Sequence, residues 1–186
     1  MEAELKNVLF SAGDRLKVQG RINLDADRFQ VDLGSMSSEL ALHFNPRFHY
    51  GDDKTPVLVC NSKCDGVWKQ EQRETHNPFQ PGSTFKVVVK HAGDLFEVML
   101  PDGNMIEFPN RHGLEVITYI RIKDVIYLRE TVSSKSLDRP KVRVLMLFLS
   151  KPSNFHRAYT GKTGSENRTR ETRSAFQQLK NVLPDC

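Results

Sequence analysis

Short segments with alternating apolar and polar residues fill residues 1–130, and turn residues separate them. In residues 28–34, for example, Phe29, Val31 and Leu33 alternate with polar neighbours, and Gly34 ends the run. Similar segments follow in LALHFNPRF, PVLVCN, STFKVVVKH, LFEVML, MIEFPN and EVITYIRI. Short strands that recur every 8–12 residues or so, with turn residues between them, are typical of antiparallel β-sandwiches and barrels. We therefore predict an all-β fold.

The last part of the chain differs in composition. Residues 1–138 hold 17 of the 27 Lys+Arg and 20 of the 23 Asp+Glu, a balance of −3, so residues 139–186 hold 10 and 3, a balance of +7. Residues 151–175 are rich in small polar and basic residues, which disfavours a packed core. Residues 170–183 are compatible with one weak amphipathic helix. We predict a folded domain over residues 1–130 and a basic, flexible extension over residues 131–186.

Composition excludes several classes of protein. The hydrophobic fraction of 38% and the charged fraction of 27% are ordinary for a globular chain. No apolar run reaches the roughly 18 residues of a membrane span, and the first residues do not resemble a secretory signal peptide. Cys60, Cys64 and Cys186 are too few for a disulfide framework, and no second pair at metal-ligand spacing follows. We therefore expect free thiols, no metal and no cofactor.

One predicted strand carries a row of polar side chains. His43, Asn45 and Arg47 occupy alternate positions of LHFNPRF, so on a strand they project from one face. The opposite face would carry Leu42, Phe44, Pro46 and Phe48. We call His43, Asn45 and Arg47 the polar shelf. Taken alone, this pattern fits an ordinary half-exposed strand better than a binding site.

A second polar segment follows in NSKCDGVWKQEQRE. It holds Asn61, an Asp65-Gly66 turn, the single tryptophan Trp68, and then Glu71 and Arg73 at alternate positions. A lone tryptophan in a β-domain more often belongs to the core. Here its neighbours are polar, which favours partial exposure.

The motifs HFNPRF, VCNS, W-x-x-E-Q-R and FPNR, in this order and spacing, resemble the carbohydrate-recognition domain of the galectin family. The resemblance extends from about residue 5 to about residue 122. It implies a sandwich of two antiparallel sheets, of the jelly-roll type, that binds β-galactosides without metal or catalysis. Galectins lack signal peptides and act in the cytosol and, after non-classical export, outside the cell. Lactose and N-acetyllactosamine-type glycans are the expected ligands.

The resemblance also implies a role for each matching residue. The polar shelf of His43, Asn45 and Arg47 would hydrogen-bond the galactose 4-hydroxyl, and Asn61 and Glu71 would hold the 6-hydroxyl. Trp68 would stack on the apolar face of the ring, which an aromatic plane covers without loss of hydrogen bonds. Arg73, with Glu71, would reach the neighbouring glucose or N-acetylglucosamine.

The sequence departs from the family pattern in two places. The loop after the polar shelf reads His49-Tyr50-Gly51-Asp52-Asp53, where many members have one histidine, so His49 or Tyr50 is a candidate contact to the outer side of the sugar. After Lys123 the family's short closing strand is not recognisable. VIYLR or VRVLMLFL (residues 142–149) could replace it, or the position could be empty; we favour VIYLR. Because terminal strands form the dimer interface of one-domain galectins, homodimerisation stays open.

Four functions compete at this point. A non-catalytic lectin fits all seven site residues. A glycoside hydrolase needs two carboxylates roughly 5–10 Å apart, and only Glu71 is available, beside Arg73, which would keep it ionised. A structural or protein-binding relative without sugar affinity is the main alternative. Nucleic-acid binding by the basic extension is disfavoured, because its basic residues are scattered and few aromatic residues lie among them.

Overall fold

The computed structural model describes residues 2–49 and 55–133, and for residues 127–133 it describes the backbone only. Within these residues the chain forms strands and no helix, as the alternating pattern predicts. Tyr50 and the features expected in the extension, including the candidate strand at 142–149 and the helix at 170–183, lie outside the described residues. No described helix is long and apolar enough to cross a membrane.

The strands follow one another closely. Gly66 lies in a turn, as predicted, whereas Gly34, expected to end a strand, lies inside one that continues to Met36. The bounds of the strands are β1 (Glu2–Ser11), β2 (Arg15–Ile22), β3 (Gln30–Met36), β4 (Glu39–Arg47), β5 (Val57–Cys64), β6 (Val67–Trp68), β7 (Gln72–Glu74), β8 (Thr84–His91), β9 (Leu95–Met99), β10 (Met105–Pro109), β11 (Val116–Lys123) and β12 (Val125–Ser133).

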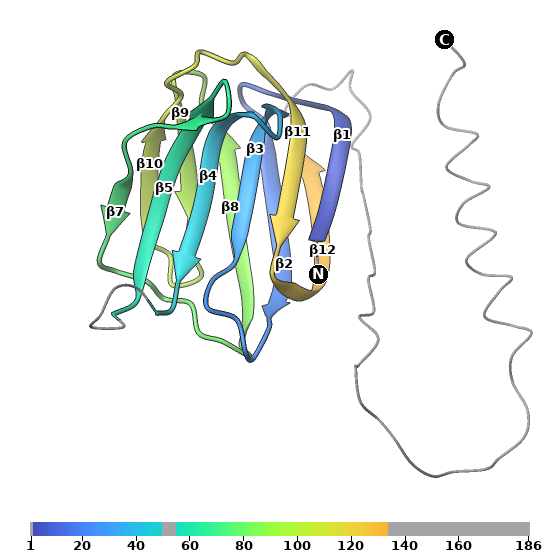
Figure 1. Ribbon diagram of the computed structural model, residues 1–186. Coiled ribbons are helices and arrows are strands. Elements are labelled where there is room, and N and C mark those ends of the chain that lie inside the picture. Colours follow the sequence, from blue (N-terminus) through green and yellow to red (C-terminus); the bar gives the residue numbers. More distant parts are fainter. Residues whose placement is uncertain (1, 50–54, 134–186) are drawn as a thin grey trace, which may run out of the picture. The chain divides into compact units, whose positions relative to one another are not determined.

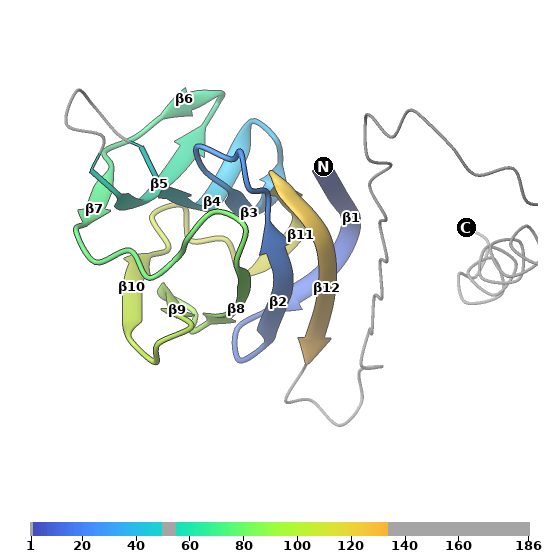
Figure 2. The same ribbon diagram turned by 90° about the horizontal axis from the view of Figure 1, so that it is seen from below.

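Two antiparallel sheets lie face to face, as Figures 1 and 2 show. One sheet has the order β1-β11-β3-β4-β5-β6, with β7 also paired to β5. The other has the order β10-β9-β8-β2-β12. The predicted antiparallel β-sandwich is therefore confirmed.

The core lies between the sheets and consists of the inward-facing residues of each strand. Phe29 is at its centre, with Phe85 at 4.7 Å and Phe79 at 5.0 Å between ring centroids. Phe44 and Phe48 also contact this ring cluster from β4 and the residue after it. Each buried side chain of this kind contributes about 1.5–3 kcal/mol relative to an exposed one. The cluster therefore holds β4 firmly in place.

A tight hairpin joins β3 to β4 and sets their register. At Gly34 an added Cβ would lie 1.9 Å from the carbonyl oxygen of Glu39, so no side chain fits there. The register shifts on both sides of Gly34 and then places Asp32 opposite His43. The glycine thus fixes which β3 residues lie beside the polar shelf.

Strand β12 takes the position of the closing strand. Its residues include VIYLR and pair with β2 from Val125↔Ile22 to Ser133↔Arg15. The chain enters it through Asp124, whose φ of 65° lies in the left-handed region, and Val125 is buried in the core. The favoured candidate therefore fills the position, and the boundary predicted at residue 130 falls inside this strand.

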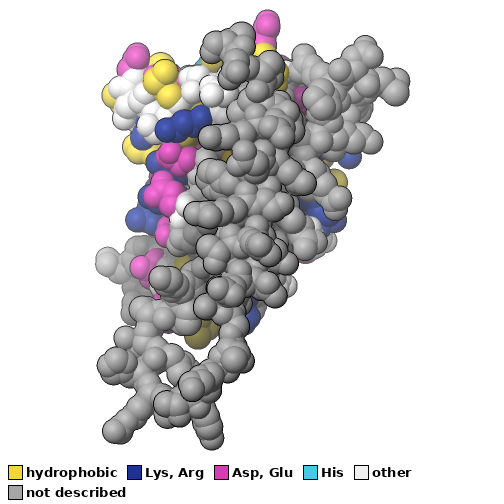
Figure 3. Space-filling model, turned by 90° about the vertical axis from the view of Figure 1, so that its right-hand side faces the viewer, with side chains coloured by type: hydrophobic (Ala, Val, Ile, Leu, Met, Phe, Trp, Pro, Cys, Tyr) yellow, Lys and Arg dark blue, Asp and Glu magenta, His cyan; other side chains and the backbone are white. Residues whose placement is uncertain are grey.

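Charged side chains alternate along the β1 side of the sandwich. Figure 3 shows acidic and basic side chains interspersed on the visible part of this face. Glu2 lies 3.3 Å from Lys123 and 3.8 Å from Arg121, and Glu4 lies 3.6 Å from Lys6. Such exposed pairs contribute little to stability, roughly 0–1 kcal/mol each.

Candidate functional site

The polar shelf lies on β4, as predicted. His43, Asn45 and Arg47 share the outer face of the strand, whereas Leu42 and Phe44 are fully buried between the sheets. The backbone of β4 pairs with β3 on one side and β5 on the other. The shelf is therefore carried by a central strand that cannot move independently of the core.

A buried carboxylate orients His43. Asp32 on β3 is completely buried, and its Oδ1 lies 2.6 Å from His43 Nδ1. Its Oδ2 accepts hydrogen bonds from Arg121 Nε at 2.9 Å and Nη2 at 2.8 Å. A neutral histidine in this position holds its proton on Nδ1, which leaves Nε2 as an acceptor for a ligand hydroxyl.

Asp32 and Arg121 belong to none of the motifs that predict the site. Each is one polar residue in an alternating strand, and such residues usually face solvent. Their contact depends on the pairing of β11 with β3, which places Arg121 opposite Asp32. No sequence signal specified that register.

A chain of hydrogen bonds connects the rest of the shelf to Glu71. Asn45 Nδ2 donates to the Phe29 carbonyl at 2.7 Å, and Asn45 Oδ1 accepts from Arg47 Nε at 2.9 Å. Arg47 Nη2 donates to Glu71 Oε1 at 3.1 Å. On the other side, Arg73 Nη2 lies 2.7 Å from Glu71 Oε2. Glu71 is thus held between two guanidinium groups.

These contacts determine the charge of Glu71. Partial burial raises the pKa of its carboxyl group, but the hydrogen bonds and charges of Arg73 and Arg47 outweigh this and hold the pKa below its usual value of 4.5. Glu71 is consequently ionised near neutral pH and acts as a hydrogen-bond acceptor. The predicted effect of Arg73 on Glu71 is confirmed, and Arg47 adds to it.

Asn61 and Trp68 complete the set. Asn61 on β5 donates from Nδ2 to the Lys69 carbonyl at 3.0 Å, and its Oδ1 accepts from the Ser62 backbone. Trp68 on β6 is 45% exposed, which confirms the expected partial exposure. Its ring centroid lies 4.6 Å from that of His43, and Lys63 Nζ lies 4.6 Å from the indole. One aromatic surface therefore stands beside the shelf.

Six of the seven predicted residues line one open hollow of about 470 Å³. The seventh, Arg73, adjoins it through Glu71. The hollow is lined by Arg28, Gln30, His43, Asn45, Arg47, Asn61, Trp68, Lys69 and Glu71. Sequence reasoning missed Arg28, Gln30 and Lys69, which belong to no motif. His49 is exposed, and its Nδ1 lies 3.7 Å from Asp27.

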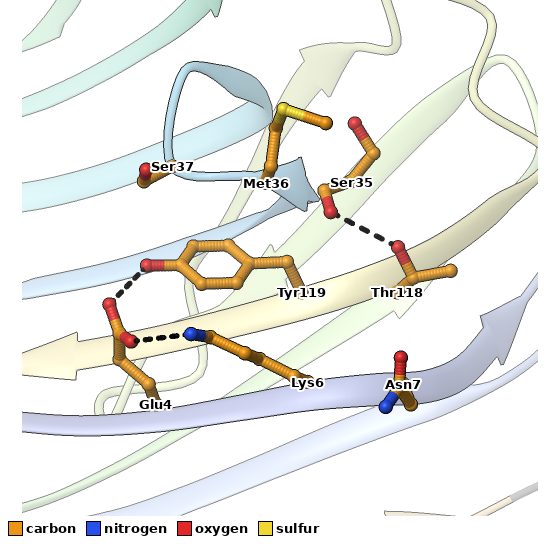
Figure 4. A pocket seen from close by; sticks show the side chains of 8 residues that line it. All are labelled: Glu4, Lys6, Asn7, Ser35, Met36, Ser37, Thr118 and Tyr119. Carbon is orange, nitrogen blue, oxygen red and sulfur yellow. Dashed lines mark hydrogen bonds and ion pairs between the residues drawn. The ribbon is translucent and has the colours of Figure 1, made fainter.

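The same sheet carries a second polar hollow, of about 300 Å³, near β1 and β11 (Figure 4). The Tyr119 hydroxyl donates to Glu4 Oε1 at 2.6 Å, and burial and this bond raise the pKa of the phenol. Tyr119 and Arg121 project from the same face of β11, because they are two residues apart. The polar face therefore extends from the first hollow across β3 and β11 to β1.

Among the described residues, the lining of the first hollow lacks the carboxylate pair of a hydrolase. Glu71 is the single carboxylate among these residues. Asp32, beneath His43, is completely buried and already pairs with His43, Arg121 and Gln30. A glycosidase would need an acid and a second carboxylate on either side of the scissile bond.

Comparisons with known proteins agree with this geometry. The family model described as galactoside-binding lectin matches residues 1–132. Goat galectin-1 is 46% identical over 115 residues, which cover 61% of this chain and 84% of that protein. The toad ovary galectin solved in complex with thio-digalactose is 30% identical with a TM-score of 0.68, and the match covers 71% of this chain and 98% of that one.

A further solved structure is CG-16, a homodimeric agglutinin from chicken liver. It is 35% identical with a TM-score of 0.64, and the match covers 70% of this chain and 99% of that one. The family consists of non-catalytic lectins, in agreement with the expectation that the chain is not an enzyme. The fold, the motifs and these matches together show that the chain belongs to the galactoside-binding lectin family, the galectins.

Proposed function

We propose that the protein is a lectin that binds β-galactosides in the hollow between β4, β5 and β6. The observation that carries this proposal is the position of the exposed Trp68 ring beside a shelf of oriented polar groups. The indole covers the apolar face of a galactose ring. The axial 4-hydroxyl then points to His43, Asn45 and Arg47, and the 6-hydroxyl to Asn61 and Glu71.

The charged groups supply selectivity for galactose. Hydrogen bonds to ionised partners are stronger and more directional than neutral ones. A sugar with an equatorial 4-hydroxyl would leave the shelf groups without partners, which disfavours it strongly.

The neighbouring sugar would lie beside Arg73, which is half exposed and bound to Glu71. This supports lactose or N-acetyllactosamine as the ligand, with Arg73 and Glu71 in contact with glucose or N-acetylglucosamine. The toad relative's complex with thio-digalactose supports a disaccharide-sized site.

The direct test is retention of the full chain on immobilised lactose and its elution by free lactose. Trp68→Ala should lower the affinity for lactose at least about tenfold, since stacking and burial of one sugar face are lost. Val67→Ala is the matched control, because Val67 is an exposed apolar residue of the same hairpin. Sucrose should not elute the protein. Failure of correctly folded protein to bind lactose would favour the alternative, a structural or protein-binding relative.

Sugar binding by this route needs no metal, because the proposed contacts are direct hydrogen bonds and ring stacking. Retention on lactose should therefore be unchanged in excess EDTA. Loss of retention in EDTA would contradict this part of the proposal.

We also infer a homodimer that forms through the side of the sandwich where β1 and β12 end the two sheets. Leu9 on β1 is an apolar side chain on this side of the sandwich that is 67% exposed. CG-16 is described as homodimeric. Sedimentation equilibrium of the wild type and Leu9→Asp tests this: the substitution should shift the protein towards the monomer. A monomeric wild type at high micromolar concentration would contradict the inference.

Galectins reach the outside of cells without a signal peptide, so we propose a cytosolic and extracellular distribution for this protein. Its appearance in culture medium should persist when transport through the Golgi is blocked. Loss of secretion under that block would indicate the ordinary secretory pathway.

A further inference from the structure

Three side chains of different ligand chemistry meet at one end of the β4–β5–β6 region. Glu39 begins β4, Cys64 ends β5, and His112 lies in the loop between β10 and β11. Their carboxylate oxygen, thiol sulfur and imidazole nitrogen lie within 4.8 Å of one another. All three side chains are partly buried. They border an open depression whose lining includes Cys64 and His112.

The spacing of these groups fits a shared cation better than direct pairing. His112 Nδ1 and Glu39 Oε2 are 3.9 Å apart, which is too long for a hydrogen bond. Ligands of one tetrahedral zinc ion lie roughly 3.3–3.7 Å apart, given metal bonds of about 2.0–2.3 Å. An inward movement of about an ångström would therefore bring all three atoms to bonding distance.

Glu39 is already oriented for such a role. Its Oε1 accepts a hydrogen bond from the backbone N–H of Asp65, while Oε2 is the oxygen nearest His112. Hydrogen bonds that fix the direction of a ligating carboxylate are a regular feature of metal sites. The Gly66 backbone also donates to the Ser38 carbonyl, so the β5–β6 turn is held against the start of β4.

The electrostatic surroundings favour a cation at this point. Burial and the negative charges of Glu39 and Asp65 raise the pKa of the Cys64 thiol, although Lys69 opposes them. A divalent ion would relieve this repulsion and stabilise the thiolate. Arg111, which borders the same depression, is directed elsewhere: it donates to the Gln70 carbonyl at 2.7 Å, and its guanidinium lies over Phe108.

We propose that Glu39, Cys64 and His112 bind a zinc ion, with a fourth position open to water. One sulfur, one nitrogen and one oxygen ligand form a set that zinc accepts and that magnesium or calcium does not. The ion would connect β4, the β5–β6 turn and the 110–115 loop. Cys64 pairs with Val67 in the hairpin that carries Trp68, so the zinc would add stability at the base of that hairpin, whereas the contacts of Trp68 with His43 and Lys63 do not involve the ion. The sequence suggested no metal site, because these ligands are far apart in the chain and only folding brings them together.

Cobalt(II) is a suitable probe, because a cobalt–thiolate bond gives a charge-transfer absorption in the near ultraviolet that carboxylates and histidines do not give. Metal-free, reduced full-length protein is titrated with cobalt, and zinc is then added. We expect saturation at one cobalt per chain and displacement of the absorption by zinc. Cys64→Ser should remove the band, and His112→Asn and Glu39→Gln should weaken cobalt binding at least about tenfold, the lower end of what even a supporting contact costs.

Two variants serve as controls. Cys186→Ser removes another thiol, and His76→Asn removes a histidine that pairs with a carboxylate, Asp102, without a thiol nearby. Both should keep the wild-type spectrum. Circular dichroism verifies that each variant is folded. Zinc at a hundred-fold excess over its Kd should also raise the Tm of the wild type by roughly 5 °C and leave that of Cys64→Ser unchanged. A wild type without the band, a band that persists in Cys64→Ser, or a band lost in Cys186→Ser would overturn the proposal.

Discussion

Asp32 fixes the orientation of the His43 ring and the nitrogen that faces a ligand. The carboxylate is completely buried and is shared between His43 on β4 and Arg121 on β11. The arginine compensates the buried charge, and the carboxylate keeps the Nδ1 atom of His43 as the donor. The role of His43 Nε2 as an acceptor therefore depends on Asp32, which does not itself line the hollow.

Asp32→Asn should impair both stability and lactose binding. Removal of one partner from a buried ion pair lowers the free energy of unfolding by about 3–5 kcal/mol. Because Arg121 is partly exposed, we expect a smaller loss of roughly 2 kcal/mol for Asp32→Asn. An asparagine can donate to Nδ1, which would move the histidine proton to Nε2, so lactose affinity should fall about tenfold. Asp14→Asn is the control: Asp14 is also buried but bonds the Ser11 backbone, so it should lose stability and keep its lactose affinity.

Glu71 should contribute to stability in a pH-dependent way. Its pKa in the folded protein lies below 4.5, so its contribution is complete above the unfolded value and is lost as pH falls through the folded value. Between about pH 5 and pH 3 the wild type should therefore lose more unfolding free energy than Glu71→Gln, with a slope difference of at most about 1.4 kcal/mol per pH unit. Urea titrations at stepped pH measure this. A difference between the two proteins that is constant with pH would contradict the assignment.

The residues found from sequence share one property, which is a place in a motif. Strand periodicity placed His43, Asn45 and Arg47 on one face, and the resemblance of HFNPRF to the galectin motif identified them as site residues. Asp32 and Arg121 were not found, because their role comes from cross-strand register, and that depends on a hairpin in which Gly34 approaches Glu39. Periodicity thus indicated which residues share a face of a strand, but not which residues of the adjacent strands lie beside them.

Strand β12 completes its sheet although its sequence departs from the family pattern. Pairing with β2 requires backbone groups and one inward apolar residue, and Val125 supplies that residue opposite Ile22. The register shift between Val125 and Tyr127 leaves Ile126 outside the regular pairing. Without β12, the backbone of β2 would be an unpaired edge. The sequence allowed two candidate segments, or an empty position, because apolar alternation alone does not say which segment reaches β2.

Val125→Ala should therefore lower the free energy of unfolding by about 2 kcal/mol, because removing the buried methyl groups of Val125 leaves a cavity in the core. Ile126→Ala, one position along the same strand and only partly buried, should cost less than half as much. Denaturant unfolding of both variants measures the difference. Equal losses would mean that β12 does not close the core as described.

At the scale of the whole molecule, the two sheets and the described residues of the proposed sugar site lie within residues 2–133. The positive charge is concentrated beyond them, with −3 over residues 1–138 and +7 over residues 139–186. The proposed sugar site and the basic character of the chain therefore belong to different parts of the sequence, and they can be separated by experiment.

A chain that ends at residue 138 should keep the Tm and the lactose affinity of the full chain. At a hundred-fold excess over Kd, lactose adds about 2.7 kcal/mol to the free energy of unfolding, which corresponds to a rise in Tm of roughly 5–10 °C. Both chains should show this rise when thermal scans with and without lactose are compared. A chain that ends at residue 123, before β12, is the contrasting control and should unfold at much lower temperature, because β2 loses its partner. If the chain ending at 138 were unstable, residues beyond the two sheets would contribute to the fold, and the sandwich would not be sufficient by itself.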